Sequence, residues 1–176
     1  MRNGRFGGIK LNNFLNDLEY SLDERDNDLF DNWYYRIFPG LNKIEFVEEL
    51  KTQKKGIDKV LYFENGKAIT IDEKKRRKNY NDILLELWSV WESRKLGWLF
   101  TSQCDYIVYA IMPSKKVYLL PTLLLRQAWH SNKEKWKTRY KMIEAINRNY
   151  TTKSIVVPAD VLAEAVSREM NQSFYN

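Results

Sequence analysis

Two aspartates and a lysine flank a predicted β-hairpin, and together they have the chemistry of a metal site. Asp58 precedes the first predicted strand, and Asp72 and Lys74 follow the second. Two carboxylates a few ångströms apart repel each other unless a cation lies between them, and Mg²⁺ prefers oxygen ligands. A backbone carbonyl, for example that of Glu73, would add a ligand, and Lys74 would orient or activate an attacking water. These residues are suited to hydrolysis of a phosphodiester.

Whether the two acids meet depends on the register of the hairpin. A two-residue turn would place Asp58 opposite Glu73, and the acids would diverge. A three-residue loop with Gly66 in the left-handed conformation would place Asp58 opposite Asp72, with Lys74 on the same face. The glycine at the third loop position favours this second register. The two predicted strands are rich in β-branched and aromatic residues and are separated by Asn-Gly, a strong hairpin signal; they are residues 59–63 and 67–71.

The charges at the open end of the hairpin also have a structural explanation. Strand edges often carry charges that discourage aggregation, and the run DEKKRRK would serve that purpose. The context of Asp58 favours a site, because this residue follows Gly-Ile directly and precedes an apolar strand.

The two segments Gly56-Ile-Asp58 and Ile71-Asp72-Glu73-Lys74 resemble the signature of the PD-(D/E)XK nuclease superfamily, which includes restriction endonucleases and recombination exonucleases. The resemblance implies that Asp58 and Asp72 bind Mg²⁺, with Mn²⁺ as an alternative, and that Lys74 is catalytic. It implies DNA as the substrate, with RNA not excluded. Residues 50–125 also resemble a group of small, mostly uncharacterised phage-type and prokaryotic nucleases of this superfamily.

The sequence departs from the superfamily pattern at two positions. Ile57 stands where the name-giving proline would be, and Glu73 occupies the middle of the triplet, where an apolar residue is usual. Glu73 is therefore a further candidate metal ligand, with Glu73-x-Lys75 as a second interpretation of the triplet.

Two more glutamates extend the candidate site. Many members of the superfamily add a carboxylate from the helix before the hairpin and a polar residue from the helix after it. The resemblance thus implies Glu19 as a metal ligand and Glu86 as a catalytic residue, each at the margin of an apolar helical stripe. The alternative for each is an ordinary solvated glutamate.

Basic residues cluster on both sides of the hairpin. The formal net charge of +6 indicates a polyanionic partner, although many basic proteins bind no nucleic acid. Each lysine or arginine near a phosphate would add a salt-sensitive contribution to binding, whereas a solvated charge run is the alternative. The candidate nucleic-acid contacts are Lys54, Lys55, Lys75, Arg76, Arg77 and Lys78.

The periodicity of apolar residues predicts the elements that must position these side chains. Their order is helices, hairpin, helix, hairpin, helices, which indicates a mixed α/β (α+β) fold; the resemblance specifies a restriction-endonuclease-like central mixed β-sheet flanked by helices. Helices are expected at residues 11–22, 29–37, 83–91, 123–129, 136–146 and 158–170, strands at 59–63, 67–71, 106–112, 117–120 and 154–157, and a helical or extended segment at 44–50.

Length and composition set the remaining expectations. With 176 residues and 44% hydrophobic residues, we expect one folded domain over residues 1–176, with residues 1–9 as a flexible arm. The single cysteine, Cys104, indicates a reducing compartment, the cytoplasm, and no apolar run is long enough to span a membrane. Cutting both strands of a duplex usually needs two sites, which favours a homodimer. Two other classes stay open, a non-catalytic nucleic-acid-binding protein that retains the fold and a structural or assembly protein.

Overall fold

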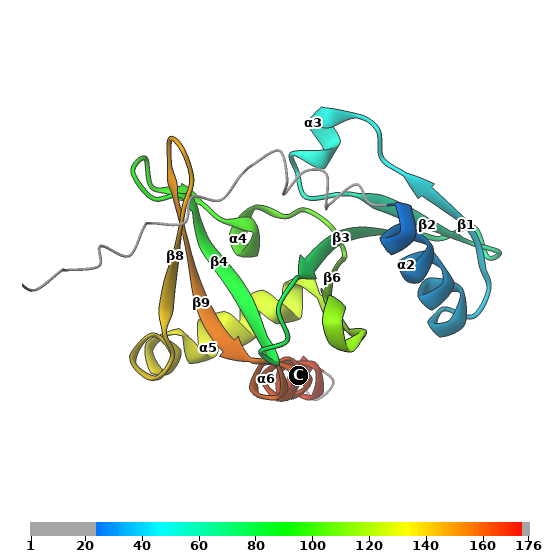
Figure 1. Cartoon of the computed structure of the whole chain (residues 1–176). Helices are drawn as coiled ribbons and strands as arrows, with labels where there is room; N and C mark the ends of the chain where they lie inside the picture. Colours follow the sequence, from blue (N-terminus) through cyan, green and yellow to red (C-terminus); the bar gives the residue numbers. More distant parts are fainter. Residues whose placement is uncertain (1–23, 174–176) are drawn as a thin grey trace, which may run out of the picture.

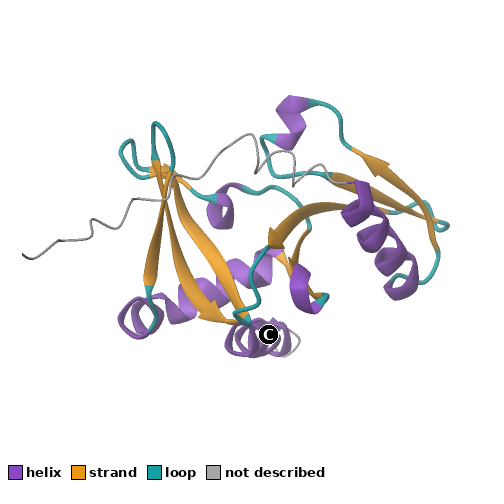
Figure 2. Cartoon of the chain, viewed as in Figure 1, coloured by secondary structure: helices purple, strands orange, loops and turns teal. Residues whose placement is uncertain are grey.

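The computed structural model describes residues 24–173, which form two β-sheets with helices packed around them (Figures 1 and 2). The helices are α2 (Glu24–Ile37), α3 (Leu50–Gln53), α4 (Trp98–Thr101), α5 (Thr122–Arg139) and α6 (Ala159–Ser173), with a short 3-10 helix η1 (Met112–Ser114). The strands are β1 (Leu41–Phe46), β2 (Lys59–Phe63), β3 (Ala68–Arg76), β4 (Asp82–Val90), β5 (Lys95–Leu96), β6 (Tyr106–Ile111), β7 (Lys116–Pro121), β8 (Met142–Ile146) and β9 (Thr151–Pro158). The expected arm at residues 1–9 and the candidate ligand Glu19 lie outside the described residues.

The first sheet is mixed and has the strand order β1-β2-β3-β6-β7. Its neighbours pair antiparallel except β3 and β6, which run parallel from Ile71 opposite Tyr106 to Arg76 opposite Ile111. The two hairpins expected from the sequence, β2–β3 and β6–β7, are both present. The expected mixed α/β (α+β) class is confirmed, whereas the restriction-endonuclease-like arrangement stays a prediction.

The second sheet is antiparallel and has the order β5-β4-β9-β8. One of its two inner strands, β4 (Asp82–Val90), lies where the sequence analysis predicted a helix at residues 83–91, and that prediction is wrong. Ile83, Leu85 and Leu87 alternate as buried residues, a period of two, and β4 gains ladder hydrogen bonds from β9 and β5. The chain therefore builds two sheets instead of one central sheet (Figure 1).

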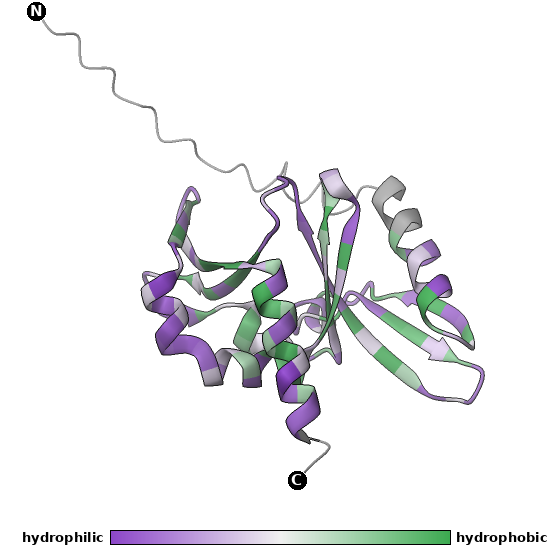
Figure 3. Cartoon of the chain, turned by 90° about the horizontal axis from the view of Figure 1, so that it is seen from below, coloured by the Kyte–Doolittle hydropathy of each residue, from purple (hydrophilic) through white to green (hydrophobic). Residues whose placement is uncertain are grey.

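The first sheet separates two hydrophobic cores, and β6 contributes to both. Val108 and Ala110 face the smaller core, where Phe30 and Tyr34 of α2 pack against Leu61. The larger core lies between the second sheet, β6 and the helices α5 and α6; its fully buried members include Ile83, Leu85, Ile107, Ile111, Leu125, Ile155 and Leu162. In Figure 3, hydrophobic and hydrophilic residues alternate along helices and strands, as expected of elements that bury one side.

Two boundaries in the last third of the chain also differ from the expectation. One helix, α5, covers the predicted segment 123–129 and continues to Arg139, and residues 142–146 form strand β8 instead of helix. Of the residues in the predicted helix 136–146, Trp136 lies in α5 and in the larger core, whereas Tyr140 and Ile143 lie beyond the end of the helix. None of the described helices is both long and apolar enough to cross a membrane.

Candidate active site

The β2–β3 hairpin has the register that brings the two aspartates together. Lys59 lies opposite Ile71, and the amide of Phe63 donates to the carbonyl of Lys67 over 2.9 Å, which closes a three-residue loop. Gly66, the third loop residue, has a φ of 77°, a conformation that glycine adopts without strain. Asp58 directly precedes β2; its amide donates to the carbonyl of Ile71 and its carboxylate accepts from the amide of Glu73, so it lies beside the segment of β3 that carries Asp72.

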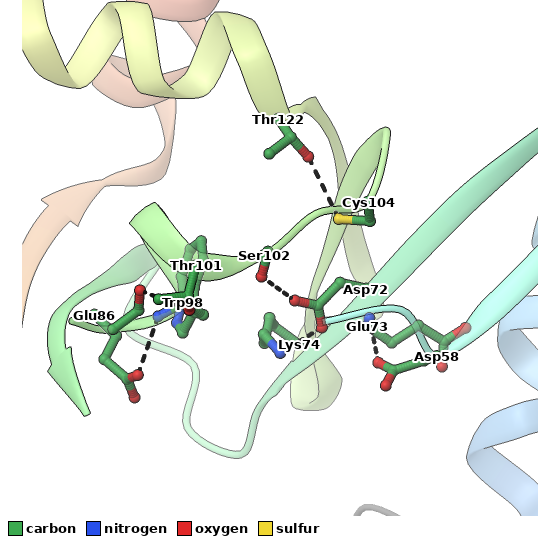
Figure 4. Close-up of polar contacts among 11 residues, drawn as sticks. Asp58, Asp72, Glu73, Lys74, Glu86, Trp98, Thr101, Ser102, Cys104 and Thr122 are labelled. Carbon is green, nitrogen blue, oxygen red and sulfur yellow. Dashed lines mark hydrogen bonds and ion pairs between the residues drawn. The ribbon is translucent and has the colours of Figure 1, made fainter. Parts of the chain in front are cut away.

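Asp72 is buried, with 1% of its surface exposed, and both carboxylate oxygens have partners (Figure 4). Oδ2 accepts a hydrogen bond of 2.6 Å from the hydroxyl of Ser102, and Oδ1 forms an ion pair with the ammonium of Lys74. The Lys74 side chain keeps 29% of its surface exposed. Asp72 is thus held in one orientation, and solvent reaches the site beside Lys74.

A glycine just before the hairpin makes room for this arrangement. Gly56 has a φ of 70°, and a Cβ there would lie 2.5 Å from the Oγ of Ser102 and 2.9 Å from the Oδ2 of Asp72. No side chain fits without displacing the Ser102–Asp72 pair. The sequence Gly56-Ile-Asp58 therefore has a packing reason for its first residue as well as a chemical one for its last.

Asp58 is the less stabilised of the two acids. Its Oδ2 accepts a hydrogen bond of 2.8 Å from the amide of Glu73. Burial raises the pKa of Asp58 to about 6, and the nearby carboxylate of Asp72 adds to the rise, while Lys74 and the Glu73 amide oppose it. A cation at this point would relieve the repulsion between the two carboxylates.

Lys74 carries its positive charge within electrostatic reach of both acids. Burial alone would lower the pKa of Lys74, but the carboxylates of Asp72 and Asp58 outweigh that effect and raise the pKa above its ordinary value. Glu86 also contributes to this rise, so its carboxylate lies within electrostatic reach of the lysine.

Glu86 reaches the site from β4 of the second sheet, and not from the helix that the sequence analysis predicted. Its Oε1 accepts a hydrogen bond of 3.2 Å from the amide of Trp98, and burial raises its pKa. A Cβ at Gly97 would lie 2.4 Å from the carbonyl oxygen of Glu86, so only glycine permits this close approach of the two segments. Figure 4 shows Glu86 apart from the Asp58–Asp72 pair, with no direct interaction drawn between them.

Glu73 points to the other face of β3. Its Oε1 accepts a hydrogen bond of 2.8 Å from the hydroxyl of Tyr34 and lies 3.0 Å from the Nζ of Lys59. The structure therefore does not bring the Glu73 side chain together with the carboxylates of Asp58 and Asp72. Its backbone amide, in contrast, is part of the site.

The six predicted basic contacts differ in where they lie. Lys54 and Lys55 are exposed in the turn before Gly56, and Arg77 and Lys78 are exposed beyond the end of β3. Lys75 lies over the ring of Phe30 at 5.7 Å, on the face of β3 that carries Glu73. Arg76 lies on the Asp72 face, where its guanidinium pairs with Asp82 at 2.8 Å.

Ser102 is a site residue that the sequence analysis missed. It is 2% exposed, and its carbonyl accepts a hydrogen bond from Arg126, whose Nε also donates to the carbonyl of Leu99 over 2.8 Å. The hydroxyl of Ser102 is thereby fixed against Asp72. No local pattern marks a serine thirty positions along the chain from its partner, so only the fold could identify it.

The donor set fits a hard cation that keeps much of its hydration. Asp58 and Asp72 supply carboxylate oxygens, which Mg²⁺ prefers, and Mg²⁺ is commonly held by one or two carboxylates while it retains waters. Within residues 24–173, no group of three or more histidine, cysteine, aspartate or glutamate side chains is close enough together to hold a metal on its own. If a cation binds here, these two side chains would form an open site in which water supplies the other ligands.

The chain was compared with protein-family models, with curated proteins and with solved structures, and none of the three comparisons gives a match.

Proposed function

We propose that the chain is a metal-dependent nuclease that hydrolyses phosphodiester bonds of DNA. The observation that carries this proposal is that the hairpin brings Asp58, Asp72 and Lys74 close enough together for the charges of all three to interact. Two acids with one lysine beside them, at a point that solvent reaches, are suited to holding a cation next to a phosphate. The resemblance to the PD-(D/E)XK signature supports the same function.

Asp58, Asp72 and Lys74 have different roles in the proposed reaction. Asp58 and Asp72 would hold Mg²⁺, or Mn²⁺ in its place, and the ion would supply charge stabilisation and a water of lowered pKa. In the metal-free chain Lys74 keeps its proton at neutral pH, because the acids raise its pKa. We therefore assign Lys74 to stabilising negative charge on the phosphate and to positioning the water.

Ser102 and Glu86 have supporting roles in this proposal. Ser102 fixes the orientation of the Asp72 carboxylate through a hydrogen bond from its hydroxyl. Glu86 adds a third negative charge from the second sheet, within electrostatic reach of Lys74. From this position the Glu86 carboxylate can act on the site through a bound water.

The compartment and oligomeric state remain part of the proposal. Cys104 is buried, and burial raises the pKa of its thiol to about 11, so the thiol is unreactive and suits the reducing cytoplasm. A homodimer would supply two sites for cutting both strands of a duplex.

The direct test is cleavage of a panel of labelled linear, circular, single-stranded and branched DNA, with RNA included, in Mg²⁺, Mn²⁺ or chelator. We expect cutting that needs metal, and we expect Asp72→Asn and Lys74→Gln each to lower it by about 100-fold or more. Matched controls lie at the closed end of the same hairpin, where Glu64 and Lys67 are exposed. Glu64→Gln and Lys67→Gln should retain wild-type activity.

Two results would contradict hydrolysis and select another function. Binding of DNA that needs no metal and survives Asp72→Asn, without cleavage of any substrate, would identify a non-catalytic binding protein. Absence of salt-dependent DNA binding would point to a structural or assembly protein.

A further inference from the structure

The loop at residues 77–81 joins the two strands that carry the candidate site. Strand β3 places Asp72, Lys74 and Arg76 on one face, and the loop begins directly after Arg76 (Figure 1). The chain then returns along β4, which carries Glu86. At a rise of about 3.3 Å per residue, the start of the loop lies about 10 Å from Lys74 along the strand. Any long substrate that leaves the site in this direction meets the loop.

Contacts at its two ends hold this loop in place. Arg76 and Asp82 close its base through an ion pair of 2.8 Å. Asn81 adopts a left-handed conformation with a φ of 50°, its carbonyl accepts a hydrogen bond of 3.0 Å from Ala159, and its side chain accepts one of 3.2 Å from Lys116. The residue before Asn81 is therefore presented by a fixed backbone.

That residue is Tyr80, and its side chain is 60% exposed. It belongs to neither hydrophobic core of the described chain. Its ring centroid lies 5.3 Å from the guanidinium carbon of Arg76 and 5.9 Å from the ammonium of Lys78. An aromatic ring that is exposed, carried next to an anchored backbone and flanked by two cations is a feature of surfaces that bind single-stranded nucleic acid.

The ring distinguishes between two kinds of nucleic acid. The phosphates of a duplex need only cations, because its bases are already stacked on one another. The bases of a single strand have open faces, and stacking on an aromatic side chain stabilises them whatever their sequence. An exposed tyrosine among cations therefore favours a strand with unpaired bases.

We propose that Tyr80 is a stacking platform for an unpaired base of the nucleic acid held at the candidate site. The loop begins about 10 Å from Lys74 along β3, so a strand held at the candidate site can reach the ring within a few nucleotides. The preferred substrate then carries a single-stranded segment close to the bond that is cut. This inference rests on the proposed nuclease function for the position of the cut, but the binding it describes does not need cleavage.

The test measures binding in chelator, where the proposed reaction cannot proceed. The probes are a fluorescently labelled single strand, the matching duplex, and the duplex with a short single-stranded arm. We expect Tyr80→Ala to weaken binding of the single strand and of the armed duplex by about 5- to 150-fold, the range for loss of one base stack. Binding of the plain duplex should change less than twofold, and Tyr80→Phe, which keeps the ring, should bind like the wild type.

Two controls separate stacking from charge and from general damage. Tyr35 of α2 is 52% exposed and makes none of the cation–ring contacts found among residues 24–173, so Tyr35→Ala should leave binding unchanged. Lys78→Ala should weaken single strand and duplex alike and reduce the salt dependence, whereas Tyr80→Ala should leave the salt dependence as it is. A thermal melt of each variant checks that the fold is intact.

The outcomes distinguish this inference from the proposed function. Equal losses on single strand and duplex, or no loss with Tyr80→Ala, would overturn the stacking platform even if the wild type cuts DNA with Mg²⁺. A loss confined to probes with unpaired bases supports the platform, and it does so even if no substrate is cut with metal. In that last case the nuclease proposal fails and the binding surface stands.

Discussion

On each face of strand β3 a lysine lies beside two acids, Lys59 on one face and Lys74 on the other, but the lysine is used differently on each. On the face toward α2, Lys59 contacts both of its acids, Asp31 at 2.7 Å and Glu73 at 3.0 Å. Its side chain is 3% exposed, and that of Glu73 is 7% exposed. The hydroxyl of Tyr34 adds a further donor to Glu73. Charge on this face is paired inside the protein.

On the opposite face the pairing is incomplete. Among the described residues, Lys74 forms its ion pair with Asp72, while Asp58 depends on the amide of Glu73 and has a pKa raised to about 6. Glu86 adds another buried acid with a raised pKa. The comparison teaches that buried charge alone does not mark a functional site. Buried charge that lacks an internal partner does, because something from outside can then stabilise it.

The largest expected change in stability comes from replacing Lys59, the lysine on the face of β3 toward α2. Lys59→Met leaves Asp31 and Glu73 without their cation, and the loss of one partner from a buried pair costs about 3–5 kcal/mol. Urea denaturation should show a drop of that size in the free energy of unfolding. The double variant Lys59→Met/Glu73→Gln should recover part of the loss, because it no longer leaves a buried carboxylate unpaired. An unchanged midpoint for Lys59→Met would mean that this face is not held by its ion pairs.

On the face of β3 that carries Asp72, a substitution is expected to raise stability instead of lowering it. Asp58→Asn keeps an oxygen for the Glu73 amide and removes a charge that burial disfavours, so it should stabilise the metal-free protein at pH 7.5. The pKa of Asp58 rises from an ordinary value near 4 to about 6, and each factor of ten in proton affinity is worth about 1.4 kcal/mol, which gives about 2–3 kcal/mol. Cleavage, if present, should be lost in the same variant.

The stabilisation by Asp58→Asn should increase as the pH rises. Between about pH 4 and pH 6 the folded wild type binds more protons at Asp58 than the unfolded chain does, so this group lowers stability as the pH rises through that window. The variant has no such proton to lose. The advantage of Asp58→Asn in urea denaturation should therefore shrink toward zero as the pH falls from 7.5 to 4. Parallel stability curves for the two proteins would contradict the raised pKa.

Mg²⁺ should stabilise the protein only through the face of β3 that carries Asp72. At a Mg²⁺ concentration one hundred times its dissociation constant, ligand linkage predicts about 2.7 kcal/mol of added stability for the wild type. Asp72→Asn should abolish this gain, whereas Lys59→Met, although less stable, should keep it. Thermal melts with and without Mg²⁺ measure both. An equal gain in the Asp72→Asn protein would place the cation elsewhere on the chain.

The sequence predicted the hairpin and its register because turn chemistry is local. Asn65-Gly66 and the alternation around it decide how β2 and β3 pair, and nothing distant is needed for that. The strand β4 could not be predicted in the same way. Ile83 and Leu87 fit a helical period and a strand period equally well, and the choice is made by pairing with β9 about seventy residues later.

The remaining parts of the site come from contacts that no local pattern records. Ser102 and Gly97 lie in a connecting segment, and their roles follow from what packs against them, Asp72 in one case and Glu86 in the other. Glu73 shows the converse. Its place beside Asp72 in the sequence suggested a ligand, but the period of two along β3 turns its side chain to the other face.

The smallest expected effect on stability compares one hydroxyl from each face. Tyr34 donates to Glu73 over 2.8 Å and Ser102 donates to Asp72 over 2.6 Å, so Tyr34→Phe and Ser102→Ala each remove one donor from a carboxylate of β3. A hydrogen bond to a charged group contributes about 1.5 kcal/mol or somewhat more, and both variants should lose about that much in urea denaturation.

The activities of the two variants should differ, because only Asp72 is assigned to the metal. Loss of a hydrogen-bond partner behind a metal ligand commonly costs about 10- to 100-fold in affinity or activity, so Ser102→Ala should weaken cleavage and Mg²⁺ binding, while Tyr34→Phe should change neither by more than about twofold. If both variants lose activity equally, the two faces act as one unit, and the distinction between paired and unpaired charge fails at this strand.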